Sequence, residues 1–174
     1  MKKIYVTGVS GNGKSAVVKE LKKSGLLAFD IEDIENMCYW IDKKTNEVAQ
    51  DHQPTMEWLN NHDWVCNISL LKDLLDQYPN QTIIISGITG NQDEYLKLFD
   101  KVILLQSQKD IFLNRIKNRH LNPDENSFGK NQVERDFVEN IYEEFEAKLI
   151  KEGAIPINSE LPINKVVAEI LTKI

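Results

Sequence analysis

The sequence predicts an α/β protein with a doubly wound sheet of parallel strands. Short β-branched runs alternate along the chain with helical apolar patterns, which is typical of β-α-β units. One run, Thr82–Ser86 (TIIIS), is apolar without alternation, as expected of a strand covered on both faces. A glycine-rich segment lies directly between the first such run and the first helical pattern.

The first elements follow from local signals. A strand is expected over Lys3–Thr7 (KIYVT), which ends at a glycine. The apolar residues of Lys14–Ser24 fall on one helix face, and Gly25 is placed to cap that helix at its C-terminus. Leu26–Asp30 (LLAFD) is the second expected strand.

The remaining elements repeat this alternation. Further strands are expected over Thr82–Ser86, Lys101–Gln106 and Ala154–Asn158, and the proline within the last indicates an edge position. Helical patterns lie between and after them, over Ser69–Gln77, Asp93–Phe99, Asp110–Arg119, Val133–Glu152 and Ile163–Thr172.

Two segments interrupt the alternation and are expected to be insertions over one edge of the sheet. Ile31–Val65 separates the second and third strands and holds Trp40, Trp58 and Trp64. His120–Asn131 is polar, contains proline and glycine, and separates two helices. Tryptophans more often belong to a core than to a binding site, but Trp40 follows an acidic box and is therefore a binding candidate.

Composition excludes several classes of protein. The net charge of −6 disfavours nucleic acid as a partner, and no apolar run is long enough for a membrane span. Cys38 and Cys66 are isolated in sequence and are expected to be reduced thiols in a cytoplasmic protein. Neither these cysteines nor the three distant histidines predict a metal site.

Residues Gly8–Ser15 (GVSGNGKS) fit G-x-x-x-x-G-K-[ST], the P-loop pattern, in the strand-to-helix context that it requires. Glycines let backbone N–H groups turn toward phosphate oxygens. We expect Lys14 to be exposed and to reach the β- and γ-phosphates, and the Ser15 hydroxyl to bind Mg²⁺. The predicted nucleotide-binding positions are Gly8, Ser10, Gly11, Asn12, Gly13, Lys14, Ser15 and Ala16.

A carboxylate is expected near this loop. The sequence has no N-K-x-D motif of switch GTPases, and the third strand ends in Ser86-Gly87 rather than in aspartate. Asp30 instead ends the second strand, in FDIEDIE, and would face the loop at the carboxyl edge of the sheet. It could orient Mg²⁺ through water or accept a proton from a substrate hydroxyl. Alternatively, Asp30 or Asp33 caps the following helix.

The chain resembles the small P-loop kinases, which include adenylate, shikimate and gluconate kinases. The P-loop, FDIEDIE, a lid after R-x-x-x-R and the GAIPINS ending carry the resemblance over nearly the whole chain. It is most similar to bacterial nucleoside-kinase-like ATP-binding proteins, whose conserved boxes correspond here to Asp30–Asp33, Trp40–Glu47, Gly87–Glu94 and Asn126–Lys130.

The resemblance implies roles at the matching positions. Asp30 matches a carboxylate linked to Mg²⁺ and the acceptor, and Glu32 matches one that binds acceptor hydroxyls. Asn91 and Gln92 lie near the place where adenylate kinase holds the acceptor base with a glutamine. The full predicted set for substrate is Asp30, Glu32, Asp33, Trp40, Gly87, Asn91 and Gln92.

The cationic candidates precede the expected lid. Arg115 and Arg119 are four residues apart and share a helix face, where one could stack on adenine and the other neutralise the transferred phosphoryl group. A solvated helix face is the alternative interpretation. Lys130 and Arg135 are further lid candidates.

Together these observations predict a P-loop NTPase three-layer sandwich with a five-stranded parallel sheet of order 2-3-1-4-5. The predicted domain covers residues 1–174, with 31–65 as a substrate-binding insertion and 120–131 as a lid. The predicted activity is ATP- and Mg²⁺-dependent phosphoryl transfer to a nucleoside, nucleotide or other small hydroxylated acceptor, with Lys14, Asp30, Arg115 and Arg119 as the catalytic set. The alternatives are a plain NTPase, a nucleotide-dependent switch, and a polynucleotide 5′-hydroxyl kinase, which the net charge disfavours. The sequence leaves open the acceptor, the ATP or GTP preference and the oligomeric state.

Overall fold

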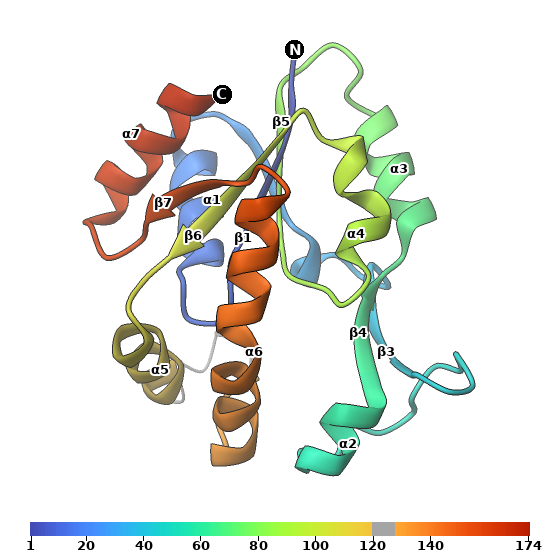
Figure 1. Cartoon of the computed structure of the whole chain (residues 1–174). Coiled ribbons are helices and arrows are strands. Elements are labelled where there is room, and N and C mark those ends of the chain that lie inside the picture. Colours follow the sequence, from blue (N-terminus) through green and yellow to red (C-terminus); the bar gives the residue numbers. More distant parts are fainter. Residues whose placement is uncertain (120–127) are drawn as a thin grey trace.

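A computed structural model describes residues 1–119 and 128–174. Its main sheet has five parallel strands in the order β2-β5-β1-β6-β7, which is the predicted order 2-3-1-4-5 (Figure 1). The bounds of these strands are β1 Lys3–Thr7, β2 Leu27–Asp30, β5 Ile83–Ser86, β6 Lys101–Gln106 and β7 Ile155–Asn158. Strand β7 lies at the edge, as Pro156 predicted.

Helices cover both faces of this sheet. Helices α1 (Lys14–Lys23) and α7 (Ile163–Lys173) pack on one face, and α3 (Ile68–Asp76) and α4 (Gln92–Tyr95) on the other (Figure 1). A 3-10 helix, η2 (Leu96–Leu98), continues from α4, so the predicted helix over 93–99 is split in two. The three-layer α/β fold predicted from the sequence is confirmed.

The centre of the sheet is apolar because its strands are covered on both sides. Ile83, Ile84 and Ile85 are all buried, which explains the absence of alternation in β5. Two buried tyrosines bring hydroxyl groups into this core. The Tyr5 and Tyr95 hydroxyls lie 2.8 Å apart, and the Tyr95 hydroxyl also lies 2.7 Å from that of Thr89.

The segment between β2 and α3 forms a second, smaller unit of structure. The 3-10 helix η1 (Ile31–Asp33) is followed by the antiparallel pair β3 (Cys38–Asp42) and β4 (His62–Cys66), with α2 (Met56–Asn61) between them. The sequence predicted an insertion here but not its strands. A long connection of mixed composition joins β3 to β4, so no short-turn signal marks the hairpin.

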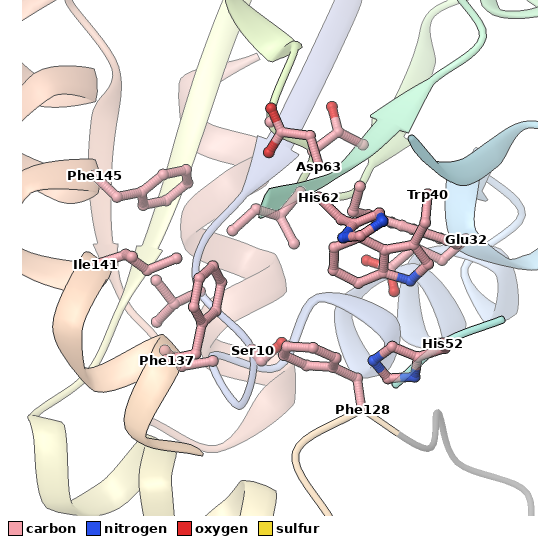
Figure 2. A pocket seen from close by; sticks show the side chains of 16 residues that line it. Ser10, Glu32, Trp40, His52, His62, Asp63, Phe128, Phe137, Ile141 and Phe145 are labelled. Carbon is pink, nitrogen blue, oxygen red and sulfur yellow. The ribbon is translucent and has the colours of Figure 1, made fainter. Parts of the chain in front are cut away.

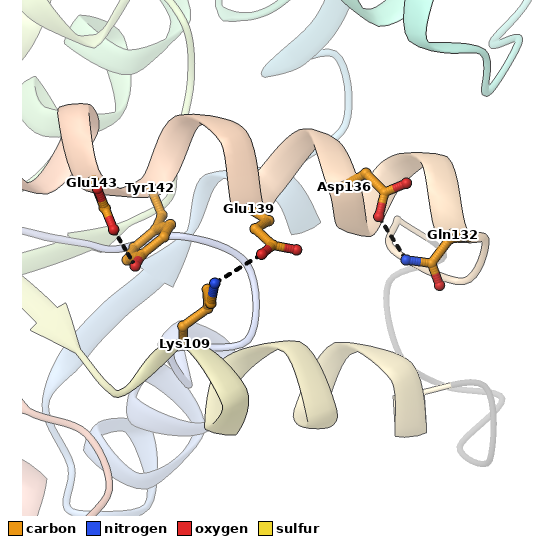
Figure 3. A network of polar contacts seen from close by, with 6 residues as sticks. All are labelled: Lys109, Gln132, Asp136, Glu139, Tyr142 and Glu143. Carbon is orange, nitrogen blue, oxygen red and sulfur yellow. Dashed lines mark hydrogen bonds and ion pairs between the residues drawn. The ribbon is translucent and has the colours of Figure 1, made fainter.

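Helix α5 (Lys109–Asn118) precedes the predicted lid in the sequence, and helix α6 (Gln132–Lys151) follows it. An ion pair between Lys109 and Glu139, 2.9 Å apart, joins them (Figure 3). Asn131 caps α6 by accepting a hydrogen bond from the Glu134 amide at 2.9 Å. Most of the predicted lid, residues 120–127, lies outside the described residues. None of the helices described is long and apolar enough to cross a membrane.

Candidate active site

The P-loop connects the central strand β1 to α1 and has the backbone shape that its glycines permit. Gly13 precedes α1 with φ of +86°. Gly11 has φ of +88° and lies so close to α5 that a Cβ there would be 2.4 Å from the Phe112 carbonyl oxygen. Asn12 ties the loop to the end of β6, because its amide donates to the Leu105 carbonyl at 2.8 Å.

Lys14 is buried, with 7% of its surface exposed, although the sequence analysis expected it to be exposed. Its ammonium group donates to the Gly8 carbonyl at 2.8 Å. Burial lowers the pKa of Lys14, whereas the nearby carboxylates of Glu32 and Asp30 act to raise it. The loop therefore encloses a cation beside two acidic groups.

Asp30 caps η1 and also contacts the P-loop. One carboxylate oxygen accepts a hydrogen bond from the Ser15 hydroxyl at 2.9 Å, and the other accepts from the Glu32 amide at 3.2 Å. The second bond caps η1, and the first joins Asp30 to the residue expected to bind Mg²⁺. The two interpretations are therefore compatible.

Glu32 lies near the P-loop. It lines a cavity together with Ser10 of the P-loop. Burial raises the pKa of Glu32 and Asp30 acts in the same direction, while Lys14 and Arg119 act to lower it. These influences indicate that Lys14, Glu32 and Arg119 lie near one another.

The cavity beside Ser10 has a volume of about 290 Å³ and is bounded by the β3–β4 unit, the P-loop and α6 (Figure 2). Its lining is mostly aromatic and aliphatic with a few polar groups. The lining residues are Val9, Ser10, Glu32, Trp40, His52, His62, Asp63, Trp64, Ile88, Thr89, Gly90, Phe128, Phe137, Val138, Ile141 and Phe145. We call it the aromatic cavity.

Stacked rings form one side of the aromatic cavity. The Trp40 and His52 rings are stacked, with centroids 5.5 Å apart and planes 7° apart. Phe128 lies beyond them, with its ring centroid 6.4 Å from each. The predicted binding residue Trp40 thus lines this cavity, and Trp64 does too, while Trp58 packs edge-on against Trp40.

A second cavity, of about 540 Å³, lies on the other side of the P-loop. Arg115 lines it, and its guanidinium donates to the Gly11 carbonyl at 3.4 Å and to the Ser159 carbonyl at 3.0 Å. Arg115 therefore holds the P-loop to the segment after β7. Its lining residues are Gly11, Gly13, Ala16, Asn114, Arg115, Asn118, Arg119, Ser159, Leu161 and Ile163. We call it the outer cavity.

Five of the predicted substrate-binding residues do not line the aromatic cavity, and one of them is Asp30, which contacts Ser15 instead. Asp33 is exposed. Gly87 is buried where a Cβ would lie 2.4 Å from the Ile31 side chain. Gln92 is buried, and its side-chain oxygen has no hydrogen-bond partner among the residues that the structure describes. Asn91 binds the end of β4, since its side chain accepts from the Cys66 amide at 2.9 Å and donates to the Cys66 carbonyl at 3.0 Å.

The lid candidates have local partners. Arg135 donates to the carbonyls of Gly129 and Lys130, at 2.9 and 2.7 Å, and so fixes the turn that begins α6. Lys130 is exposed. Whether either group contacts a ligand stays a prediction.

Asn91→Ala should lower stability more than it lowers acceptor affinity. The substitution removes two hydrogen bonds to Cys66 and leaves a partly buried amide and carbonyl without partners. We expect a loss of about 1–3 kcal/mol in the free energy of unfolding, measured by urea denaturation. A variant of unchanged stability that has lost acceptor binding would instead favour the role that the resemblance implied.

Several cavity residues were missed at the sequence level. His52 and Asp63 lie inside the insertion, without a motif to mark them. Phe137, Ile141 and Phe145 did leave a signal, because their spacing of four places them on one face of α6. That stripe could have been interpreted only as a packing face, yet it faces the aromatic cavity (Figure 2).

Comparison with known families identifies the domain. The model of a family described as AAA domain matches residues 4–146, more than half of the chain. The chain belongs to this AAA domain family. The matched part of this AAA domain contains the P-loop, which borders both cavities, and the β3–β4 unit. A search of curated proteins found no match.

Solved structures similar to this AAA domain protein are small P-loop kinases, as the sequence predicted. Deoxyadenosine kinase from M. mycoides with bound dATP is 17% identical, with a TM-score of 0.54 and 98% of both chains covered. Shikimate kinase from Aquifex aeolicus is 21% identical, with a TM-score of 0.55 over 98% of this chain and 94% of the other. A gluconokinase from Sinorhizobium meliloti is 15% identical, with a TM-score of 0.53 over 98% and 90%. At these identities the likeness concerns the fold.

Proposed function

We propose that the protein is an ATP- and Mg²⁺-dependent phosphotransferase that acts on a small hydroxylated molecule. The observation that carries this proposal is the presence of two cavities, one on each side of the P-loop. A nucleotide in the outer cavity would place its terminal phosphate at Lys14. A second molecule in the aromatic cavity would then meet that phosphate beside Ser10 and Glu32. An enzyme whose acceptor is water needs no such second cavity.

The residues around the P-loop fit a nucleotide with Mg²⁺. Lys14, the loop amides and the N-terminus of α1 would bind the phosphates. The Ser15 hydroxyl and Asp30 supply oxygen ligands, directly or through water, of the kind that Mg²⁺ prefers. Among the described residues there is no larger metal-ligating group, which suits an ion that takes most of its ligands from phosphate and water. Bound Mg²⁺ would neutralise charge on the transferring phosphoryl group.

Glu32 is the group best placed to receive the acceptor proton. In the transfer, the acceptor hydroxyl oxygen bonds to the γ-phosphorus and the bond from that phosphorus to the β–γ bridging oxygen breaks. ADP leaves with the electron pair, and the hydroxyl proton passes to Glu32. Burial makes Glu32 a stronger base than an exposed glutamate, since its pKa is raised. Arg119 lies near Glu32 and Lys14 and would offset negative charge there.

Acceptor-dependent release of ADP tests the proposal. The purified chain should release ADP from ATP and Mg²⁺ much faster when an acceptor is added, and mass spectrometry should find the phosphorylated acceptor. The panel should contain nucleosides, nucleoside monophosphates, gluconate and shikimate, each compared with no acceptor. An equal rate under all conditions would favour a plain NTPase. ATP binding without any ADP release would favour a nucleotide-dependent switch.

A further inference from the structure

We propose that the acceptor is a planar ring compound that carries the reacting hydroxyl, bears no negative charge and presents an N–H donor to Asp63. Nucleoside monophosphates and sugar acids are rejected. This inference rests on the proposed function and narrows its acceptor class.

The charges lining the aromatic cavity exclude an anion. Two carboxylates, Glu32 and Asp63, line it, and no lysine or arginine occurs among its described lining residues. The sequence of residues 120–127 (HLNPDENS) adds no lysine or arginine either. Lys14 and Arg119 lie near Glu32, where the ATP phosphates need them, and Lys43, 3.9 Å from Asp63, does not line the cavity. A phosphate or carboxylate on the acceptor would therefore be desolvated beside like charges with no partner.

The two histidines of the cavity already have partners. His52 lies 3.5 Å from the buried carboxylate of Glu134, so any positive charge that it carries is balanced. His62 donates from Nδ1 to the Trp58 carbonyl at 2.8 Å, and its ring is stacked on that of Trp58 at 4.0 Å. Neither imidazole therefore substitutes for the missing lysine or arginine.

The walls select a flat ring. Trp40 offers one aromatic face, and the α6 stripe of Phe137, Ile141 and Phe145 lies across the cavity (Figure 2). Stacking on such a surface stabilises a bound planar heterocycle. A flexible polyhydroxylated chain would gain little from these walls and would leave its hydroxyl groups without hydrogen bonds.

Asp63 sets the hydrogen-bonding requirement of the ring. Its carboxylate lies on the side of the cavity away from Ser10 (Figure 2). A side chain at position 90 would clash with this carboxylate, because a Cβ there would lie 2.4 Å from one Asp63 oxygen. Gly90 therefore leaves room for Asp63 in the cavity wall. Lys43 is 3.9 Å from Asp63 and also donates to the Asn60 carbonyl, and it does not line the cavity. A carboxylate only accepts hydrogen bonds, so it favours an amino group over a carbonyl at the same place on the ring.

The test uses matched acceptors with the full chain, ATP and Mg²⁺. Adenosine is compared with inosine, cytidine with uridine, and each nucleoside with its 5′-monophosphate. We expect the amino nucleosides to have kcat/KM at least about tenfold above their oxo partners, because an oxo group at this place would face the Asp63 carboxylate without a hydrogen bond. We expect the monophosphates, gluconate and shikimate to fall at least 100-fold below the better nucleoside.

Asp63→Asn should abolish the preference for the amino nucleosides, because asparagine both donates and accepts. Asp73→Asn, on the exposed surface of α3, removes the same charge and should leave the preference unchanged. An amino preference that survives Asp63→Asn would overturn the role given to this carboxylate.

Two outcomes separate this inference from the proposed function. Phosphorylation of a monophosphate or sugar acid in preference to every nucleoside would overturn the inference and leave the kinase proposal intact. If no compound accepts phosphate, the kinase proposal fails, and the inference is judged by binding alone, through the fluorescence of the tryptophans around the cavity. Monophosphates that bind as tightly as amino nucleosides, or nucleosides that do not bind, would then overturn it.

Discussion

Lys14→Ala should reduce ADP release by 10³-fold or more, which corresponds to about 4 kcal/mol on the barrier. The Lys14 ammonium is held in the P-loop by the Gly8 carbonyl at 2.8 Å, so it is positioned before the nucleotide arrives. Its charge would be attracted to the β- and γ-phosphates, and more strongly as negative charge moves toward the leaving ADP. The measurement is steady-state ADP release with the best acceptor of the panel.

The same variant should remain folded. Burial disfavours the charged form of Lys14, so replacement by alanine removes a desolvated charge at little cost in stability. Lys19→Ala is the matched control, because Lys19 lies on the same helix but is exposed. We expect the control to retain activity and both variants to melt near the wild-type temperature. Normal turnover in Lys14→Ala would remove the basis for a phosphate site in this loop.

The features that the sequence predicted best are local ones. The P-loop pattern needs a strand before it and a helix after it, and both were visible in the neighbouring residues. The edge position of β7 followed from Pro156, which cannot donate a ladder hydrogen bond. The order of the sheet followed from the resemblance to P-loop kinases, since alternation alone only requires parallel strands.

Features that depend on distant partners could not be predicted. Cys38 and Cys66 are far apart in sequence, yet they face each other across the β3–β4 pair. Asn91 matched a substrate box, but its side-chain amide is used by the backbone of Cys66. Lys14 is buried because the loop folds back over it, which its charge alone did not suggest. In each case tertiary contacts decide what the residue does.

The sequence also could not predict that the carboxylates of FDIEDIE have different surroundings in the fold. FDIEDIE contains three carboxylates within four residues, and the motif assigned chemistry to Asp30 first. The chain turns directly after β2 into η1, so Asp30 faces Ser15 while Glu32 lines the aromatic cavity and Asp33 is exposed. We therefore expect a metal role for Asp30 and a proton role for Glu32.

Asp30→Asn should reduce phosphoryl transfer by about 10²-fold or more, near 3 kcal/mol on the barrier, with little change in melting temperature. Asparagine caps a helix nearly as well as aspartate, and its oxygen can still accept from the Glu32 amide. It attracts Mg²⁺ less strongly, so the Mg²⁺ concentration for half-maximal rate should rise. The measurements are acceptor-dependent ADP release across a Mg²⁺ titration and a thermal melt.

Comparing Glu32→Gln with Asp30→Asn tests which carboxylate accepts the proton of the acceptor hydroxyl. Wild-type activity should fall as the pH drops through the raised pKa of Glu32, because only the carboxylate form accepts the hydroxyl proton. Glu32→Gln should lower kcat and remove this limb of the pH profile, with an unchanged Mg²⁺ requirement. Asp30→Asn should keep the limb and change the Mg²⁺ requirement. Full activity in Asp30→Asn would show that Asp30 only caps η1. A pH profile of Glu32→Gln that still falls at low pH would show that another group accepts the proton.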